Sequence, residues 1–541
     1  MGLRSLLKKD LFMIVLLGSF LASCAIIEVG ARTEITDDIE ETPLLEFGPK
    51  AGKGGEAKES PTGGSGDGPI EVTVEEALLL ALENNRSLRV ERLNPSIRRT
   101  FEDEEEAIFD PLLSGGISFS RDKVEEKRTA NQFVENTKSE ANAELGLSQF
   151  FSTGTDVSLE VSSERTWSDL YTDQYASRVG LTVIQALLRG GGRRVSLANL
   201  YQARLDTEAS AYEFRGFAEA LVAEVEKTYW DYALAQNQIR IFQESLKVAE
   251  QQLREIEEMI GVGKLAESEV IAAQAEIASQ RQGLIVAKST MATTQLRLLR
   301  LLNPQGPRLW EREIILKDLP GVPEVKLDPA QAHVDVALQL RPDLNEARLG
   351  IERGDLEVVK TKNGLLPKMD FFLILGKTGY ADSFGSSVGD INDDGYDISA
   401  GLVFQYPFRN RGARARYKRS VLQLDQAAEA VENLAQLVEL DVRSGYIEVE
   451  RAREQISASM ATRRLEEEKL RIEKEKLRVG RSTAFLVAQA QRDLLSSQIG
   501  EIRAVVNYLK ALVELYRLEG SLLERRGISA PGREPASLPG E

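Results

Sequence analysis

The stretch Val479-Gly480-Arg481-Ser482-Thr483 follows a very long segment without proline and has a counterpart earlier in the chain, Val262-Gly263-Lys264-Leu265. The segments that precede these stretches run from about 414 to 479 and from about 193 to 260. Each can be one continuous helix, because no proline interrupts it. At 1.5 Å per residue, such a helix would be roughly 100 Å long. The pattern therefore predicts two long helical hairpins, each with a Val-Gly turn at its tip.

The hairpins belong to an internal repeat that organises most of the chain. Pro111 and Pro367 lie 256 residues apart, whereas Leu181 and Leu402 lie 221 apart, so the first half carries roughly 35 additional residues between Pro111 and Leu181. The tips Gly263 and Gly480 also match, at a still shorter spacing. Each half has the same order: a helix, a proline, alternating strands, a very long helix, a Val-Gly turn and a return helix. Further matching pairs are Ala81-Leu82 with Ala337-Leu338, Leu88 with Leu344, Gly191 with Gly412, Arg193 with Arg414, and Ala273-Gln274 with Ala490-Gln491.

The first helix of each half has start and stop signals. Thr73-x-x-Glu76 forms a capping box at the start of the first helix. Asp328-Pro329-Ala330 can start the matching helix, with proline at its first position. Pro111 and Pro367 should end these helices, because the residue before a proline avoids the α region.

Strands follow each proline. Ile398, Ala400, Leu402, Phe404 and Tyr406 alternate with residues that are mostly polar or small. Such alternation is typical of membrane-barrel strands with a lipid face and a lumen face, and equally of a half-buried soluble sheet. The N-terminal lipid signal described next, together with the absence of a spanning apolar helix, favours the barrel. We expect four strands in the first half, at about 112–121, 141–151, 155–163 and 175–187, and two in the second, at about 369–379 and 396–408.

The N-terminus predicts export and a lipid anchor. Arg4, Lys8 and Lys9 precede an apolar stretch of about 12 residues, too short to span a membrane. Leu21-Ala22-Ser23-Cys24 then resembles a bacterial lipobox, which implies cleavage before Cys24 and acylation of its thiol. The alternative, a buried cysteine after an ordinary signal peptide, ignores that the only cysteine stands at the lipobox position. Ala25 rather than Asp favours the outer membrane, by analogy with lipoprotein sorting.

Composition excludes several function classes. The formal net charge is −17, and phosphate binding needs clustered Lys and Arg, so a nucleic-acid partner is not expected. The chain has a single His, His333, and a single Cys, which excludes disulfides and Cys/His zinc sites within one chain. No nucleophile–base constellation is present, so we expect no catalysis, no cofactor and no metal. Asp390-x-Asn392-Asp393-Asp394-Gly395 resembles part of a calcium loop but lacks the distal Glu, and we interpret it as an exposed loop between strands.

Motifs in the expected order resemble the TolC-like outer membrane efflux family. They are Arg341-Pro342-Asp343-Leu344, Leu366-Pro367-Lys368-Met369, Gln185-Ala186-Leu187-Leu188-Arg189-Gly190-Gly191 (with Ala186 in place of the family's proline) and the two Val-Gly tips. The likeness covers roughly residues 72 to 525. It implies a mainly α fold with a membrane β part: a two-repeat chain of which three copies form a transmembrane β-barrel and a long periplasmic α-helical barrel.

The expected domains follow from these features. Residues 1–23 are a lipoprotein signal peptide, and 24–71 are a lipidated flexible linker rich in Gly and Pro. Residues 72–325 form the first repeat and 326–525 the second, while 526–541 form a disordered tail. The number of strands in the barrel stays open: the family's usual plan gives twelve per trimer, and the additional hairpin either joins the barrel, giving eighteen, or packs outside it.

The resemblance also implies partners and site residues. The tips, at Val262, Gly263, Lys264, Val479, Gly480, Arg481 and Ser482, would contact a periplasmic adaptor (membrane fusion) protein, or would simply form turns. An inner-membrane pump of RND or ABC type would supply energy. Some relatives place acidic residues after the second tip, where a three-fold ring forms; this chain has Leu486 and Gln489 there. Glu267 and Glu269 could substitute, or be solvated surface residues, and a hydrophobic constriction at Phe485 and Leu486 is the other option.

The leading functional expectation is a homotrimeric exit duct in the outer membrane of a Gram-negative-type bacterium, conducting substrate passively in small-molecule efflux or type I secretion. One alternative is a periplasm-spanning structural lipoprotein without a pore, but a spacer needs no strands. Another is a cell-envelope enzyme, against which the absence of a His-based catalytic constellation argues. For the long helices themselves the alternative is an ordinary antiparallel coiled coil, which does not explain why strands precede each hairpin.

Overall fold

The computed structural model describes residues 68–129, 132–168, 173–306, 308–323, 326–393, 395–532 and 534–536. The chain divides into two compact units, and one of them, residues 51–527 with 531–541, contains the helices and strands described below. Of the other unit, residues 1–50 with 528–530, only the last three residues are described. The signal peptide, Cys24 and nearly all of the predicted linker therefore lie outside the described residues.

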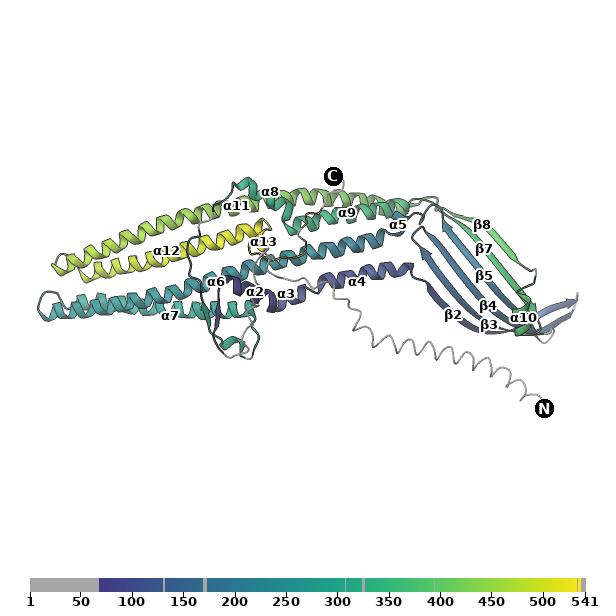
Figure 1. Cartoon of the computed structure of the whole chain (residues 1–541), viewed down its shortest axis with the longest axis horizontal. Helices are drawn as coiled ribbons and strands as arrows, with labels where there is room; N and C mark the ends of the chain where they lie inside the picture. Colours follow the sequence, from purple (N-terminus) through teal and green to yellow (C-terminus); the bar gives the residue numbers. More distant parts are fainter. Residues whose placement is uncertain are drawn as a thin grey trace, which may run out of the picture. The chain divides into compact units, whose positions relative to one another are not determined.

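Six long strands form one antiparallel sheet in the order β2-β3-β4-β5-β7-β8. Figure 1 shows them side by side. The predicted four-plus-two division is confirmed, although β2 to β4 extend well beyond the predicted ends. The bounds are β2 Leu112–Thr129, β3 Gln132–Phe151, β4 Thr155–Ser168, β5 Gln174–Ala186, β7 Lys368–Ala381 and β8 Asp397–Gln405.

The additional hairpin of the first repeat, β3 with β4, lies inside this sheet between β2 and β5. The predicted tight turn at 152–154 joins the two strands, and Gly154 has φ +84° there. A side chain at Gly154 would come within 2.5 Å of the carbonyl oxygen of Gly190, so this turn needs glycine for space as well as for conformation. Within one chain, the hairpin therefore does not pack outside the sheet.

Four helices continue the strands as a layer with the same order as the sheet. Helix α4 (Asn94–Glu106), with the 3₁₀ turn η1 (Ala107–Phe109), leads into β2, and α9 (Pro342–Asn363) leads into β7. Helix α5 (Arg193–Ser196) and α6 (Ala198–Gly261) follow β5, while α11 (Arg411–Arg478) follows β8. Helix α6 packs against both α4 and α9, and α9 packs against α11. The order α4-α6-α9-α11 places α4 at the β2 edge and α11 at the β8 edge.

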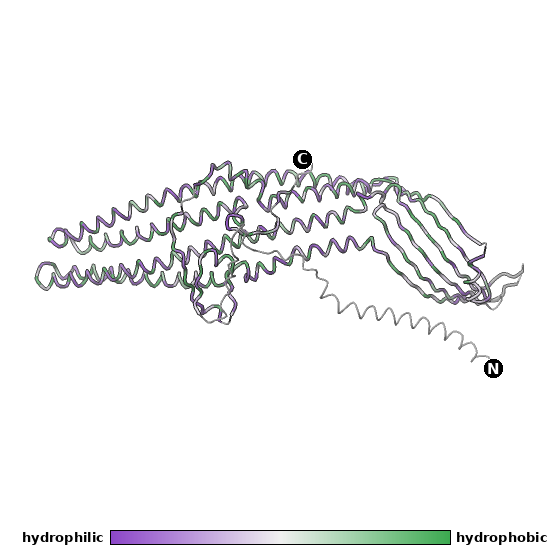
Figure 2. The backbone as a smooth tube through the Cα atoms, viewed as in Figure 1, coloured by the Kyte–Doolittle hydropathy of each residue, from purple (hydrophilic) through white to green (hydrophobic). Residues whose placement is uncertain are grey.

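The two helical hairpins are confirmed. The first pairs α6, 64 residues long, with α7 (Glu269–Leu302), and the second pairs α11, 68 residues long, with α12 (Ala484–Leu518). Both pairs are visible in Figure 1, and Figure 2 shows apolar and polar residues mixed along each of them. Helix α6 begins later than predicted, because a break at Leu197 separates it from α5.

The first helix of each repeat is broken where one long helix was expected. Helix α2 (Val74–Asn84), α3 (Arg86–Glu91) and α4 succeed one another in the first repeat, and α8 (Ala330–Leu340) precedes α9 in the second. Asn85 and Arg341 stand at the equivalent breaks with the same backbone angles, φ −62° and ψ 122°. The Thr73–Glu76 capping box is present, but Pro329 is the N-cap of α8 rather than its first helical residue, which corrects that expectation.

Several small elements were not predicted. Strand β1 (Ile70–Val72) pairs in parallel with β6 (Ile314–Leu316), so Ile70 and Glu71, assigned to the linker, are part of the fold. Helix α10 (Phe384–Asp390) lies in the loop predicted between β7 and β8, and η2 (Leu309–Glu311) and α13 (Leu522–Arg525) are short. Part of the predicted disordered tail also makes contacts, because Ala536 N–H donates to Asn345 at 3.2 Å.

Candidate duct surfaces

The sheet has one continuous apolar face, set by its register. Leu113, Leu147, Leu159, Leu181, Leu375 and Ile398 are direct neighbours across all six strands. Leu113 is 59% exposed and Ile398 64% exposed, so nothing in the described chain covers this row at either edge. Because side chains alternate along a strand, the remaining apolar residues of this face lie two positions away in each strand.

The opposite face of the sheet is mainly polar, and its apolar exceptions in β5, β7 and β8 are Ile184, Phe372, Ile374 and Val403. It carries serines, threonines and charged residues that alternate with the apolar row: Ser114, Ser118, Glu140, Glu144, Ser158, Glu160, Ser162, Glu164, Arg178, Thr182, Thr378, Asp397 and Ser399. An apolar face opposite a polar face is what a barrel between lipid and water requires. Two exposed faces of opposite character do not fit a soluble sheet packed on a core.

One ion pair crosses three strands on the polar face. Arg178 of β5 donates two hydrogen bonds of 2.7 Å to the carboxylate of Asp397 on β8. Gly376 of β7 lies between them, and a Cβ there would approach Arg178 Nη2 to 2.5 Å and Asp397 Oδ1 to 2.7 Å. The bidentate pair is therefore possible only above a residue without a side chain.

Aromatic residues gather at both ends of the strands. Near the β4–β5 turn, Phe119 packs on Trp167, and the guanidinium of Arg165 lies over both Trp167 and Tyr175. Near the helix end, Phe109 stacks on Phe150. From Tyr175 to Gln185 the strand advances about 33 Å, or about 25 Å along the membrane normal at a 40° tilt, which is the height of an apolar barrel band.

The two hairpin tips have the same backbone geometry. Gly263 and Gly480 adopt φ +77° and +72°, in the left-handed region. In the first tip, Gly263 N–H donates to Ile260 and Lys264 N–H to Met259; in the second, Gly480 N–H donates to Leu477 and Arg481 N–H to Lys476. This is the Schellman arrangement that closes a helix C-terminus. Val262 and Val479 are exposed at these tips, as are Lys264 and Arg481.

The first and second hairpins of one chain pack together near their tips. The carboxylate of Glu269 accepts a hydrogen bond of 2.7 Å from Ala484 N–H, at the start of α12. Ala484 also joins Ile256 and Ala273 in a buried apolar cluster, and Leu265 packs against this cluster and a second one on α11 and α12. Farther along, Gln491 donates to Gln252, and Arg492 contacts the buried carboxylate of Glu276.

The remaining predicted constriction residues lie on the surface of the single chain. Phe485, Leu486, Gln489 and Glu267 are exposed, whereas Glu269 is half-buried at the contact between hairpins. Glu267 and Glu269, which the sequence alone could not tell apart, thus have different environments in the structure. Ser482 donates to Glu473, so it supports the second tip from within the same hairpin.

A buried ionic cluster was missed by the sequence reasoning. Arg215 on α6 is fully buried; it lies 2.6 Å from Glu524 of α13 and 3.3 Å from Glu219. Burial raises the pKa of Glu219 to about 8, because Arg215 offsets the desolvation only in part. The signal was present, since charged residues stand at helical spacing among apolar ones, but such spacing does not reveal which face is covered. In the described part of the chain, no group of acidic, His or Cys side chains could hold a metal ion.

Comparison with known proteins decides the family. The family described as Outer membrane efflux protein matches residues 77–304 and 334–521, which is most of the chain and both repeats. This protein belongs to the outer membrane efflux protein family. None of the described helices has the length and apolar character needed to cross a membrane.

Individual members of the outer membrane efflux family are only distantly similar. The chain is 25% identical over 323 residues to the pyoverdine export outer membrane protein OpmQ of Pseudomonas putida, covering 58% of this chain and 64% of that protein. It is 24% identical over 363 residues to the toluene efflux pump outer membrane protein TtgC of Pseudomonas putida, covering 66% of this chain and 71% of that one.

Solved structures share the fold of the family. The outer-membrane channel OprN aligns with a TM-score of 0.63 at 18% identity, covering 83% of this chain and 90% of that one. The Campylobacter jejuni CmeC outer membrane channel aligns with a TM-score of 0.62 at 15% identity, covering 83% and 86%. The predicted fold class, helical hairpins joined to a membrane-type sheet in two repeats, is confirmed.

Proposed function

We propose that three copies of this chain form a passive exit duct in the outer membrane, joined to a periplasmic adaptor and an inner-membrane pump of RND or ABC type. The observation that carries the proposal is the two-faced sheet whose edge strands, β2 and β8, each have one open edge among the residues that the structure describes. Open strand edges are not tolerated in lipid, because each unpaired backbone group costs several kcal/mol. Six strands are too few to enclose a water-filled channel, so neighbouring copies must supply the missing partners.

Strand direction supports closure by copies of the same chain. All neighbouring pairs in the sheet are antiparallel, and with six strands the first and the last run in opposite directions. Strand β8 of one chain can therefore pair antiparallel with β2 of the next. Three chains then give eighteen strands rather than twelve, with the polar face toward the lumen. Since diameter grows roughly with strand number, this barrel is about half as wide again as a twelve-stranded one.

The helical end supplies the contacts to the pump machinery. The exposed tip residues Val262, Lys264, Val479 and Arg481 lie on two hydrogen-bonded Schellman turns and are accessible to an adaptor. Phe485, Leu486 and Gln489 lie exposed one turn beyond the second tip, where three copies around an axis would form the narrowest ring. We assign the constriction to Phe485 and Leu486 of this ring, with Glu269 holding the ring in place rather than lining it.

Cys24 would anchor each chain to the inner leaflet of the outer membrane. More than one acyl chain is needed for stable anchoring, and a lipobox cysteine receives several. Intact mass measurement of the mature protein should give a chain that begins at Cys24 and carries acyl groups. A chain cleaved elsewhere, without acyl mass, contradicts the anchor but leaves the duct untouched.

Conductance across planar bilayers, measured together with the mass of the purified oligomer, tests the duct. A trimer that gives discrete single-channel steps supports the proposal. A stable monomer without conductance contradicts it and favours a structural lipoprotein. Because the periplasmic end can rest closed, the Phe485→Ala/Leu486→Ala variant should be measured in parallel, and it should open more often.

A further inference from the structure

The internal repeat contains a template for the contact between neighbouring chains. Within one chain, α6 of the first repeat packs against α9, the helix that precedes the strands of the second repeat. The equivalent contact for α11 of the second repeat would be with α4, the helix that precedes the strands of the first repeat. Helices α4 and α11 lie at opposite edges of the helical layer, so this equivalent contact is available only between two copies.

The template gives this contact a register. Gln202 of α6 donates to Arg353 O at 3.1 Å and approaches Glu357 at 3.4 Å, while Lys360 donates to Gln202 Oε1 at 3.1 Å. The repeat offsets place Gln423 of α11 at the position of Gln202, and the residue type is the same. The same offsets place Phe101 and Glu104 of α4 at the positions of Glu357 and Lys360.

Charge is complementary along the whole of this register. Toward the sheet from Gln423, residues 409–419 contain six basic residues and no acidic one. Toward the sheet from Phe101, residues 102–110 contain six acidic residues and no basic one. Away from the sheet the signs reverse: Arg98 and Arg99 of α4 come opposite Asp425 and Glu429 of α11.

These charges are not used within the chain. Among the described residues, Arg411, Arg414, Arg416, Lys418 and Arg419 are exposed and form no ion pair, and the same holds for Asp103, Glu104 and Glu106. Glu102 is the exception, with Arg204 at 3.7 Å. An acidic surface on a neighbouring copy would supply the counter-charges that this basic run lacks within the described chain.

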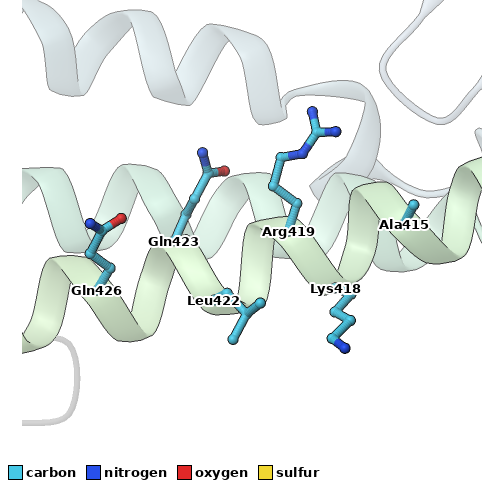
Figure 3. Close-up of a pocket in the computed structure, with 6 residues that line it drawn as sticks. All are labelled: Ala415, Lys418, Arg419, Leu422, Gln423 and Gln426. Carbon is cyan, nitrogen blue, oxygen red and sulfur yellow. The ribbon is translucent and has the colours of Figure 1, made fainter.

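The apolar residues of both helices fit the same arrangement. Helix α4 has no buried residue, and Leu93, Ile97 and Phe101 form a stripe at four-residue spacing that is about half exposed. On α11, Ala415, Lys418, Arg419, Leu422, Gln423 and Gln426 line a surface hollow of about 330 Å³. Figure 3 shows Lys418 and Arg419 projecting to different sides of the helix, so that cationic groups flank this hollow.

We propose that the acidic end of α4 in one chain binds the basic start of α11 in the next, with Phe101 of the first chain against the hollow around Gln423 of the second. The contact continues the β8–β2 pairing below the membrane and rests on the proposed trimeric duct. The contact also determines that the α4 edge of one chain meets the α11 edge of the next. Two α11 edges would bring basic residues together, and two α4 edges would bring acidic residues together.

Disulfide trapping tests the register directly. In a Cys24→Ser background, Phe101→Cys combined with Gln423→Cys should give covalent dimers and trimers when copper phenanthroline and oxygen oxidise each thiol pair. Glu357→Cys with Gln202→Cys, the template pair, should instead form a disulfide within one chain and give no covalent dimers or trimers. A Phe101→Cys/Gln423→Cys protein that is trimeric by mass but gives no covalent dimers or trimers overturns the proposal.

Charge exchange tests the electrostatics. Arg414→Glu/Arg419→Glu should lower the temperature at which the trimer dissociates in detergent, and adding Glu105→Arg/Asp110→Arg should restore it. Lys247→Glu/Arg254→Glu is the matched control on an exposed part of α6 and should leave the temperature unchanged. An unchanged trimer together with weaker binding to phosphatidylglycerol vesicles would overturn the proposal and show that the basic run binds lipid. A wild-type chain that is monomeric and does not conduct would instead refute the proposed duct itself.

Discussion

The carboxylate of Glu269, in the first repeat, accepts a hydrogen bond of 2.7 Å from the backbone N–H of Ala484, in the second repeat. The bond caps the N-terminus of α12, where the free N–H groups and the helix dipole favour an anion. Because Glu269 starts α7, the return helices of the two hairpins are tied together one turn beyond their tips. Movement of the second tip away from the first must break this bond.

Glu269→Ala should therefore loosen the tips. A lost cap of this kind costs about 1 kcal/mol, enough to raise the open fraction of a closed duct several-fold. Single-channel recording measures this fraction. Glu267→Ala removes an equal charge at an exposed position and is the control. Equal open fractions for the two variants would show that Glu269 does not hold the tips.

Gly480→Ala should destabilise the second tip. Gly480 has φ +72°, and a residue with a Cβ pays about 1–2 kcal/mol in this region. Adaptor capture from solution should weaken with it, since the displayed residues Val479 and Arg481 would shift. Gly500→Ala, in the middle of α12 with open space around it, should instead stabilise the helix by up to about 1 kcal/mol. A Gly480→Ala protein that captures the adaptor as well as wild type would argue against tip docking.

Glu514 should make the helical part sensitive to acid. Burial alone would raise the pKa of Glu514, but hydrogen bonds from Arg517 and Lys227 outweigh it and lower the pKa to about 2. The native state thus binds this proton less readily than the unfolded chain, whose pKa is about 4.5. The stabilisation is complete above pH 4.5 and is lost between about pH 4.5 and 2. In the Glu514→Gln protein, the thermal unfolding midpoint measured by circular dichroism should fall less steeply as the pH is lowered from about 4.5 to 2.

Glu219 should have the opposite effect on the pH dependence of stability, which it should lower as the pH rises. Its pKa of about 8 lies above the unfolded value of 4.5, so the native state keeps a proton that the unfolded chain releases. Stability from this group is full below pH 4.5 and falls as pH rises toward 8. Glu219→Gln, which is neutral at every pH, should remove that slope. A wild-type midpoint that does not change between pH 5 and 8 would contradict a protonated Glu219.

Gly376→Val should break the pair between Arg178 and Asp397, because its side chain would occupy the 2.5 Å approach of the guanidinium. The two charges would be left apart on the lumen face, and the sheet would lose its link between β5 and β8. We expect a trimer that dissociates at lower temperature in detergent. Gly389→Ala, with nothing within 4 Å, is the control and should behave as wild type.

The sequence predicted the repeat, the hairpins and the strand count because these depend on local patterns: alternation, proline-free length and the Val-Gly turns. It did not predict that β3 and β4 lie within the sheet, because register depends on neighbours that local pattern does not specify. It also missed β1 with β6, since three-residue strands have no periodicity to detect. Glu267 and Glu269 could not be told apart, because only packing buries one of them. The break at Asn85 was missed although its signal was present: Asn is a favoured N-cap residue, and the Asn85 side chain accepts a hydrogen bond from Leu88 N–H.

Three six-stranded sheets should close one duct. Electron cryo-microscopy of the lipidated oligomer in nanodiscs can count the strands around the symmetry axis. We expect three chains and eighteen strands, with β8 of each chain paired antiparallel to β2 of the next. A closed twelve-stranded ring with β3 and β4 outside it, or an assembly in which the six-stranded sheets do not meet, would rule out this barrel.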